Sequence, residues 1–280
     1  MAEYLRPHRL EEALGALARP LARPAVVLAG GTDFYPARVG RSIDEDVLDI
    51  SGIGSLRGIS TLPQGWRLGA TTTWSELSAA DLPPLFDGLK QAAREVGGRQ
   101  IQNAGTLAGN LCNASPAADG VPPLLALDAE IEIAGSIGSR MVMLADFITG
   151  NRRTVLQPGE LVVAIHVPKP AAEARSAFLK LGARRYLVIS IVMAAATLEI
   201  ADGRIAHARI AVGACSAVAQ RLPALEAALA GAALDSSLES RLEASHLASL
   251  APIDDVRGSA GYRRDVALTV LRRLLQGFAA

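Results

Sequence analysis

Two short glycine-rich segments carry the residues of this sequence best suited to binding chemistry. The first is LAGGTDF, residues 28–34, and the second is GTLAGN, residues 105–110. Glycine adopts positive φ without steric cost, so successive backbone N–H groups can turn towards one point and form an anion-binding concavity. Two such concavities suit the two phosphates of a dinucleotide, and Thr32 and Asp33 add a hydroxyl and a carboxylate.

Neither segment has the spacing of a common nucleotide-binding fingerprint. There is no GxGxxG after a strand and no GxxxxGK[S/T], so neither a Rossmann site nor a P-loop is predicted. A glycine pair taken alone more often marks a turn than a ligand site. The two together favour ligand binding, because the second continues into TLAGNLCNASPAAD, residues 106–119, a loop of mostly small residues.

Other side chains capable of chemistry are sparse. The two cysteines, Cys112 and Cys215, are too few for a disulfide framework or for an iron–sulfur cluster, which usually needs four thiolates. We expect both to act as small buried apolar residues. With no HxH or HxxxH pair and no acid–base dyad, we predict no metal site and no catalytic residue. The four histidines are scattered, at His8, His166, His207 and His246.

Bulk composition excludes several classes of protein. Lys+Arg and Asp+Glu number 28 each, and this zero net charge argues against a general nucleic-acid binder. No run of about 18 apolar residues indicates a membrane span. The N-terminus is charged and lacks the apolar core of a signal peptide, so a cytoplasmic location is expected.

The elements that must position the two segments alternate between short strands and helices. Before residue 168 the periodicity predicts helices over 6–18 and 85–96. It predicts a buried strand ending on the first glycine pair and strands near 47–53 and 160–168. Two segments are predicted to be mixed: a strand leads into a helix over 66–77, with its cap at Thr73 or Ser75, and a helix leads into a strand over 122–135. Residues 168–176, PKPAAEARS, indicate a domain boundary.

Beyond that boundary the pattern changes. Residues 192–215 are predicted to form a β-hairpin, because two apolar runs flank Asp202-Gly203, a strong turn signal. Helices are expected over 221–231, 237–250 and 259–278, with Ser259 capping the last. The fold class expected from these elements is mixed α+β.

Five motifs in fixed order give a specific resemblance. They are LAGGTDF, LGATTTWSEL, VGGRQIQNAGTLAGNLCNASPAADGVPPLLALDAEIEI, PGELVVAIHVP and FLKLGARRYLVIS, followed by a C-terminal DDVRGSAGYRRDVALTVLRRLL. Together they closely resemble the FAD-binding medium subunit of the xanthine dehydrogenase/carbon monoxide dehydrogenase family of molybdenum hydroxylases. The resemblance covers nearly the whole chain.

The resemblance implies a domain plan. An FAD-binding domain of the PCMH/vanillyl-alcohol-oxidase-like type would span residues 1–170, in two parts of about 1–55 and 56–170. A small α+β C-terminal domain would span 176–280, with a three-stranded antiparallel sheet and helices.

The resemblance also implies which residues contact FAD. The two glycine-rich segments would wrap its pyrophosphate, with Ala108 in place of the first glycine of the family's usual pair and expected in an αR or β conformation. Asp119 matches a contact to the polyol and ring region, although it also suits the N-cap of the next helix. Lys180 matches a cation that stabilises the reduced flavin ring, although from the residues alone it is an exposed strand-end charge. The full implied set is Leu28, Ala29, Gly30, Gly31, Thr32, Asp33, Phe34, Ile101, Thr106, Gly109, Asn110, Asn113, Ser115, Asp119, Val162 and Lys180.

One departure concerns the electron acceptor. Family members often carry an acidic or aromatic residue shortly after the lysine, whereas Val188 stands there in this chain and Tyr186 is the nearest aromatic residue. NAD is therefore not implied as the acceptor. Arg184 and Arg185 suit either an acidic partner or a solvated turn.

The implied function is electron transfer within a complex. This chain would carry FAD, and partner chains would supply the rest: a small iron–sulfur subunit with [2Fe–2S] clusters and a large molybdopterin subunit. Electrons would pass from the clusters to an external acceptor. The alternative is a stand-alone flavin oxidoreductase of the same FAD-binding fold. Substrate, final acceptor and stoichiometry stay open.

Overall fold

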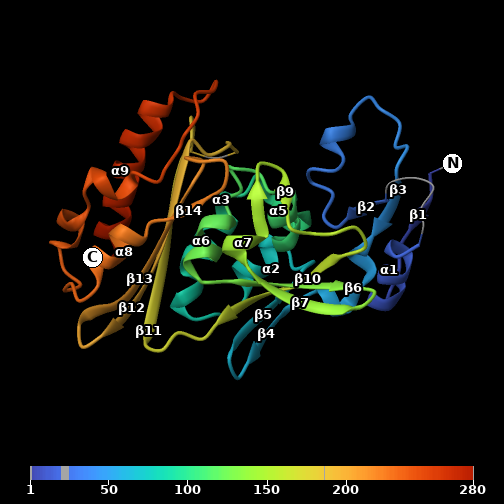
Figure 1. Cartoon of the computed structure of the whole chain (residues 1–280), viewed down its shortest axis with the longest axis horizontal. Coiled ribbons are helices and arrows are strands. Elements are labelled where there is room, and N and C mark those ends of the chain that lie inside the picture. Colours follow the sequence, from blue (N-terminus) through green and yellow to red (C-terminus); the bar gives the residue numbers. More distant parts are fainter. Residues whose placement is uncertain (1, 20–24, 186, 280) are drawn as a thin grey trace.

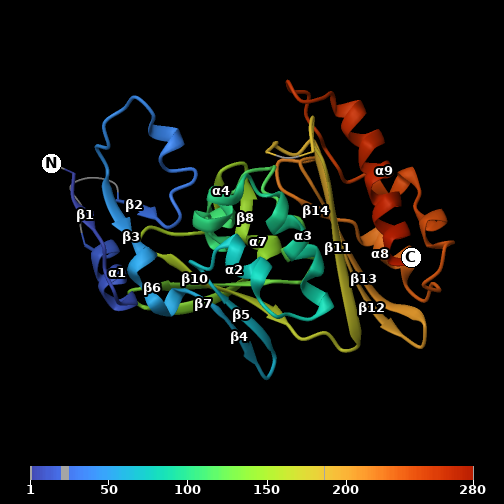
Figure 2. The ribbon, with the colours of Figure 1, turned by 180° about the vertical axis from the view of Figure 1, so that it is seen from behind.

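The computed structural model describes residues 2–19, 25–185 and 187–279. The chain forms three units in sequence order, with the N-terminus at one end of the molecule and the C-terminal unit at the other (Figure 1). The same order is seen from behind (Figure 2). No helix in these ranges is both long enough and apolar enough to cross a membrane.

The N-terminal unit is a small parallel sheet with one helix. Its strands lie in the order β1 (Tyr4–Leu5), β3 (Asp46–Asp49), β2 (Ala25–Leu28), and helix α1 (Leu10–Leu17) packs on them. The predicted helix is confirmed within a shorter range, because the chain before Leu10 is extended. Its core also contains Leu161 and Val163 of the next unit, which joins the two units tightly.

The middle unit is a five-stranded antiparallel sheet whose helices gather on one side (Figure 1). The capping-box threonine Thr73 begins the helix predicted there, so the alternative cap Ser75 is wrong. Trp74, Phe86 and Phe147 fill the core between the sheet and the helices. The elements are β4 (Ile59–Leu62), β5 (Gly65–Gly69), β10 (Leu161–Pro168), β6 (Glu130–Gly135) and β7 (Gly138–Met143) in sheet order, helices α2 (Trp74–Ala79), α3 (Asp87–Glu95), α4 (Arg99–Ala104), α5 (Leu107–Asn113), α6 (Val121–Ala126) and α7 (Leu144–Phe147), and a hairpin of β8 (Ile148–Gly150) and β9 (Arg153–Thr154).

The C-terminal unit is an antiparallel sheet covered by helices. Strands β12 (Val192–Ala201) and β13 (Arg204–Gly213) form the predicted hairpin, and β11 (Glu173–Leu181) is the third strand of the sheet that the resemblance implied. A two-residue fourth strand, β14 (Gln220–Arg221), extends it. Helices α8 (Pro223–Leu229) and α9 (Ala260–Ala279) cover one face, while α3 and α6 of the middle unit pack on the sheet from the other side (Figures 1 and 2).

Local signals explain the ends of these elements. Asp202 and Gly203 both have positive φ, as a tight hairpin turn requires, which confirms the predicted hairpin. Ser259 accepts a hydrogen bond from the backbone N–H of Tyr262 and so caps α9 as predicted.

The helix predicted over 237–250 is wrong. The segment forms two 3₁₀ turns instead, Leu238–Arg241 and Ala244–Leu247. Serine side chains bond locally here: Ser237 donates to the Asp235 carboxylate and Ser240 donates to the Ser237 carbonyl. Such local bonds compete with a continuous helix.

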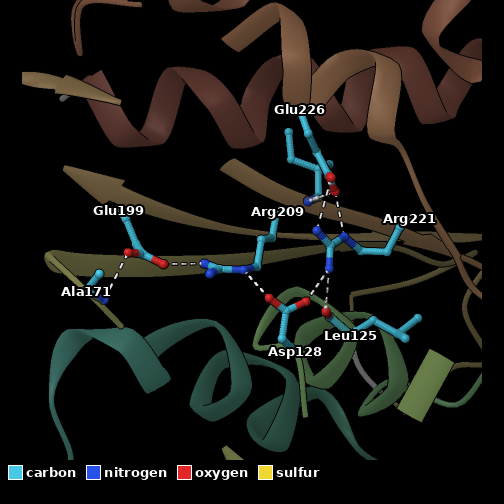
Figure 3. Close-up of polar contacts among 8 residues, drawn as sticks. Leu125, Asp128, Ala171, Glu199, Arg209, Arg221 and Glu226 are labelled. Carbon is cyan, nitrogen blue, oxygen red and sulfur yellow. Dashed lines mark hydrogen bonds and ion pairs between the residues drawn. The ribbon is translucent and has the colours of Figure 1, made fainter. Parts of the chain in front are cut away.

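A chain of alternating charges joins the middle unit to the C-terminal sheet (Figure 3). Its central member is Asp128, just after α6, whose carboxylate is paired with Arg209 of β13 and with Arg221 of β14. Arg209 also pairs with Glu199, at 2.6 Å, and Arg221 pairs with Glu226, at 2.5 Å. Glu199 is buried, so its charge depends on Arg209 for compensation.

Asp128 is the only side chain that the middle unit contributes to the ion pairs drawn in Figure 3. It has φ +49, a left-handed conformation that aspartate and asparagine tolerate better than other side chains do. Removing its charge would leave two partly buried guanidinium groups without their shared partner. Contact between the middle unit and the C-terminal sheet therefore depends on the charge of Asp128.

Asp128→Asn is expected to lower the free energy of unfolding by about 1–3 kcal/mol, because it removes the shared charge and keeps a side chain that tolerates left-handed φ. Urea denaturation measures the change. Asp81→Asn is the control, since the Asp81 side chain is exposed and forms no bond within the described residues. Equal stability of the two variants would contradict the assignment.

Candidate functional site

A cavity of about 510 Å³ lies where the N-terminal and middle units meet. This volume is within the range of roughly 300–1,000 Å³ found for small-molecule sites. Three stretches of chain supply its walls: residues 26–38, residues 96–113 and residues 156–162, with a few further residues between them. The two glycine-rich segments therefore line one space, although 70 residues lie between them in sequence.

The two segments touch backbone to backbone at Gly30. A Cβ atom built on Gly30 would lie 1.9 Å from the carbonyl oxygen of Ala104, so only glycine fits there. Gly31 has φ +70 and would place a Cβ against the ring of Tyr35. The first glycine therefore allows close approach of the two segments, and the second allows the turn.

The first segment presents unpaired backbone donors. The N–H groups of the four consecutive residues 30–33 have no hydrogen-bond acceptor among the residues that the structure describes, and all four residues line the cavity. Adjacent free N–H groups on a turning backbone attract an anion. This donor set suits an anionic group of a ligand, as predicted for the first segment, whereas in the second segment the N–H groups of Leu107, Gly109 and Asn110 already have acceptors within the protein.

Arg38 fixes the end of this segment. Its guanidinium lies 3.9 Å from the centroid of the Phe34 ring, donates to the Phe34 carbonyl at 3.0 Å and pairs with Glu45 at 2.9 Å. Arg38 also lines the cavity, with its charge shared with Glu45. This role is not predictable from the sequence, because one arginine four residues after Phe34 forms no recognisable pattern.

The second segment is a helix rather than the predicted loop. Thr106 caps α5 by accepting a hydrogen bond from the Gly109 N–H at 3.1 Å. A Cβ on Gly109 would lie 2.7 Å from the Thr106 hydroxyl, so a larger residue would displace the hydroxyl that caps the helix. Ala108 is helical, which confirms its expected αR conformation. The helix escaped prediction because seven residues are too few to show a helical period.

Most of the predicted contact residues surround the cavity. Those that line it are Leu28, Ala29, Gly30, Gly31, Thr32, Asp33, Phe34, Ile101, Thr106, Gly109, Asn110, Asn113 and Val162. Ser115, Asp119 and Lys180 do not line it. Contact of these residues with FAD stays a prediction. The structure shows that thirteen of the sixteen line the same cavity.

Asp119 and Lys180 pair with each other instead. Lys180 Nζ lies 2.6 Å from one carboxylate oxygen of Asp119, and the Ser190 hydroxyl donates to the other at 2.5 Å. Both charged side chains are buried, with 8% and 5% exposure. The interpretation of Lys180 as an exposed charge is therefore wrong. Asp119 is also not an N-cap, since its carboxylate makes no capping bond to α6.

Burial raises the pKa of the Asp119 carboxyl, while Lys180 and Ser190 act against that rise. The three residues connect different parts of the chain: Asp119 precedes α6, Lys180 lies in β11, and Ser190 precedes β12. This cluster therefore ties the middle unit to the C-terminal sheet.

Cys112 faces the cavity, which contradicts its predicted burial in the core. Desolvation by the surrounding residues raises the pKa of the Cys112 thiol to about 12. Cys215 is buried as predicted. Among the described residues, no cluster of three or more His, Cys, Asp or Glu side chains has the arrangement of a metal site.

The segment after Lys180 contains the departure from the family pattern. Arg184 donates to the Leu187 carbonyl at 3.1 Å, which closes a turn. Val188 packs back towards Gly182, where a Cβ would lie 2.3 Å from its methyl group. Tyr186 lies outside the described residues.

Asp119→Asn is expected to destabilise the protein by about 3–5 kcal/mol, because Lys180 would stay buried without a counter-charge. Asparagine can still accept the Ser190 bond, so the change isolates the charge. Adding Lys180→Met should recover at least half of the loss in urea denaturation. A double variant as unstable as Asp119→Asn would refute the ion pair as the cause.

Alkylation of Cys112 by iodoacetamide should accelerate about tenfold per pH unit from pH 7.5 to 9.5, without a plateau, because only the thiolate reacts. A free thiol, with a pKa of about 8.5, should level off in this range. Mass spectrometry follows the modified peptide, with N-acetylcysteine as the reference. A plateau for Cys112 would contradict the raised pKa.

Two family models match the chain. The model of the FAD binding domain in molybdopterin dehydrogenase matches residues 1–170. The model of the CO dehydrogenase flavoprotein C-terminal domain matches residues 177–278.

Full-length relatives agree with these models. The chain is 31% identical to a putative xanthine dehydrogenase FAD-binding subunit of Escherichia coli strain K12, over 98% of this chain and 94% of the relative. It is 32% identical to the carbon monoxide dehydrogenase medium chain of Afipia carboxidovorans, over 98% and 95%.

Solved structures share the fold. A carbon monoxide dehydrogenase from Hydrogenophaga pseudoflava matches with a TM-score of 0.88 and 29% identity, over 99% of this chain and 96% of that one. Quinoline 2-oxidoreductase from Pseudomonas putida 86 matches with a TM-score of 0.89 and 28% identity, over 100% and 97%. The chain therefore belongs to the FAD-binding medium subunits of the xanthine dehydrogenase and CO dehydrogenase family, which are oxidoreductase subunits of molybdenum hydroxylases.

Proposed function

We propose that this chain holds FAD in the cavity between its N-terminal and middle units and serves as the electron-transfer subunit of a molybdenum hydroxylase complex. The observation that carries the proposal is the row of free N–H groups at residues 30–33, which line a cavity of about 510 Å³ together with residues of α5. When bound, FAD supplies the electron-transfer chemistry. The residues of this chain bind and orient it.

Each wall of the cavity has a separate task in this proposal. The first segment binds the pyrophosphate through its backbone donors, and Arg38 holds the end of that segment through the Phe34 carbonyl. The asparagines of α5 offer further amide groups to the cavity. Ile101, Leu161 and Val162 provide apolar surface that excludes water from the ring system.

Lys180 has a changed role in the proposal. A free ammonium beside the flavin was expected from the family resemblance, but here its charge is shared with Asp119. Its electrostatic effect on a ligand in the cavity is therefore that of an ion pair, which falls off faster with distance than that of an isolated cation. We assign the pair chiefly to holding β11 against the segment before α6.

The partner chains would supply the remaining redox centres. Two cysteines are too few to hold a [2Fe–2S] cluster, so such clusters and the molybdopterin belong to an iron–sulfur subunit and a large subunit in this proposal. Relatives named as medium chains support assembly with other chains. Electrons would arrive from the clusters and leave to an external acceptor. Both cysteines are free, as is usual in the reducing cytoplasm proposed here.

Gly109→Val is expected to abolish retention of FAD, because the added side chain displaces the Thr106 cap and enters the wall formed by α5. The stripped chain is reconstituted with FAD, and its flavin absorbance is recorded after desalting. Gly261→Val is the matched control, since a Cβ on Gly261 meets no atom within 4 Å.

Cys112→Ala should retain FAD, because alanine is no larger than cysteine. If the unaltered chain takes up no flavin, the proposed function falls. If it binds flavin but purifies from its host without iron–sulfur and molybdenum chains, the stand-alone flavin oxidoreductase becomes the better description.

A further inference from the structure

A hairpin outside the cavity forms hydrogen bonds to the C-terminal end of α5. Asn151 and Arg152 form the turn between β8 and β9, and Arg152 has φ +58. The backbone N–H of Arg152 donates to the Ala114 carbonyl at 2.8 Å. Its guanidinium Nη1 donates to the Asn113 carbonyl at 3.3 Å and also to the Asn113 side-chain oxygen.

This contact compensates the end of a helix. Ala114 has φ +46, which ends α5 and leaves its last carbonyl groups without partners inside the helix. The guanidinium of Arg152 supplies donors and a positive charge, both of which are favourable at a helix C-terminus. Because α5 forms one wall of the cavity, the hairpin positions that wall.

The same contact determines the orientation of an amide group. Arginine can only donate, so the Asn113 oxygen must face Arg152 and the amide nitrogen must face elsewhere. That nitrogen has no acceptor among the described residues, and Asn113 lines the cavity. Asn110 is oriented in the same manner, since its oxygen accepts from the Gly120 N–H at 3.3 Å. The α5 wall thus offers donors to the ligand.

We propose that Arg152 is a positioning residue of the cofactor site. It holds the end of α5 in place and turns the Asn113 amide so that its N–H donors are left for an acceptor oxygen of the ligand, a phosphate or a flavin carbonyl. This inference rests on the proposed function, because the ligand is taken to be FAD. Arg152 itself does not line the cavity and acts through Asn113.

The test compares two neighbouring arginines of the same hairpin. Arg152→Met removes the donors but keeps the chain length and a Cβ, so the strain at φ +58 is unchanged. Arg153→Met is the matched control, because Arg153 is exposed, carries the same charge and forms no bond to α5 within the described residues. FAD is titrated into each stripped full-length chain, and flavin fluorescence gives the dissociation constant. Arg152→Met should weaken binding about 3–10-fold, as expected for loss of one oriented hydrogen bond, and Arg153→Met less than about twofold.

A double-mutant cycle separates positioning from general damage. Asn113→Ala removes the amide, and adding Arg152→Met to it should then cause little further loss of FAD affinity. Independent, additive losses would overturn the inference, and so would equal affinities for Arg152→Met and Arg153→Met. If the unaltered chain binds no FAD, the proposed function itself fails and this inference falls with it.

Discussion

The cavity depends on one contact between two backbones. Gly30 lies against the Ala104 carbonyl so closely that no side chain fits between them. This contact brings the turn after β2 to the start of α5, so that the backbone donors of the turn and residues of the helix line one space. Close packing makes such a contact intolerant of even one added methyl group. The remaining features of the site, including the Thr106 cap and the Arg38 contacts, hold the two partners of this contact in place.

The site is supported from outside as well as from within. Arg152 caps the far end of α5, and the Asp119–Lys180 pair fixes the segment that follows it. Both supports come from β-structure that is distant in sequence: the first from the β8–β9 hairpin and the second from β11. A short helix of seven residues has little stability alone, so these tertiary contacts must supply it. The cavity wall thus depends on contacts from distant parts of the chain.

Sequence reasoning found the elements with strong local signals and missed those decided by distant partners. The Asp202-Gly203 hairpin and the Ser259 cap depend on neighbouring residues, and both were predicted. Asp119 and Lys180 are 61 residues apart, and no local sequence pattern predicts that they pair. Thirteen of the sixteen residues implied by the family resemblance line the cavity, but the resemblance did not point to Arg38 or Arg152, because their roles arise from tertiary geometry.

The charge chain through Asp128 limits how this chain can be recombined with its relatives. Asp128 belongs to the middle unit, whereas Arg209 and Arg221 belong to the C-terminal sheet. A chimaera joined near residue 170 separates the two sides of this interface. Transplanting the C-terminal unit therefore requires an acceptor with a carboxylate after its α6, in a backbone conformation that lets it reach two neighbouring strands. In sequence the two units are joined by a short linker, but an exchange of units must also preserve the ion pairs of Asp128 with Arg209 and Arg221.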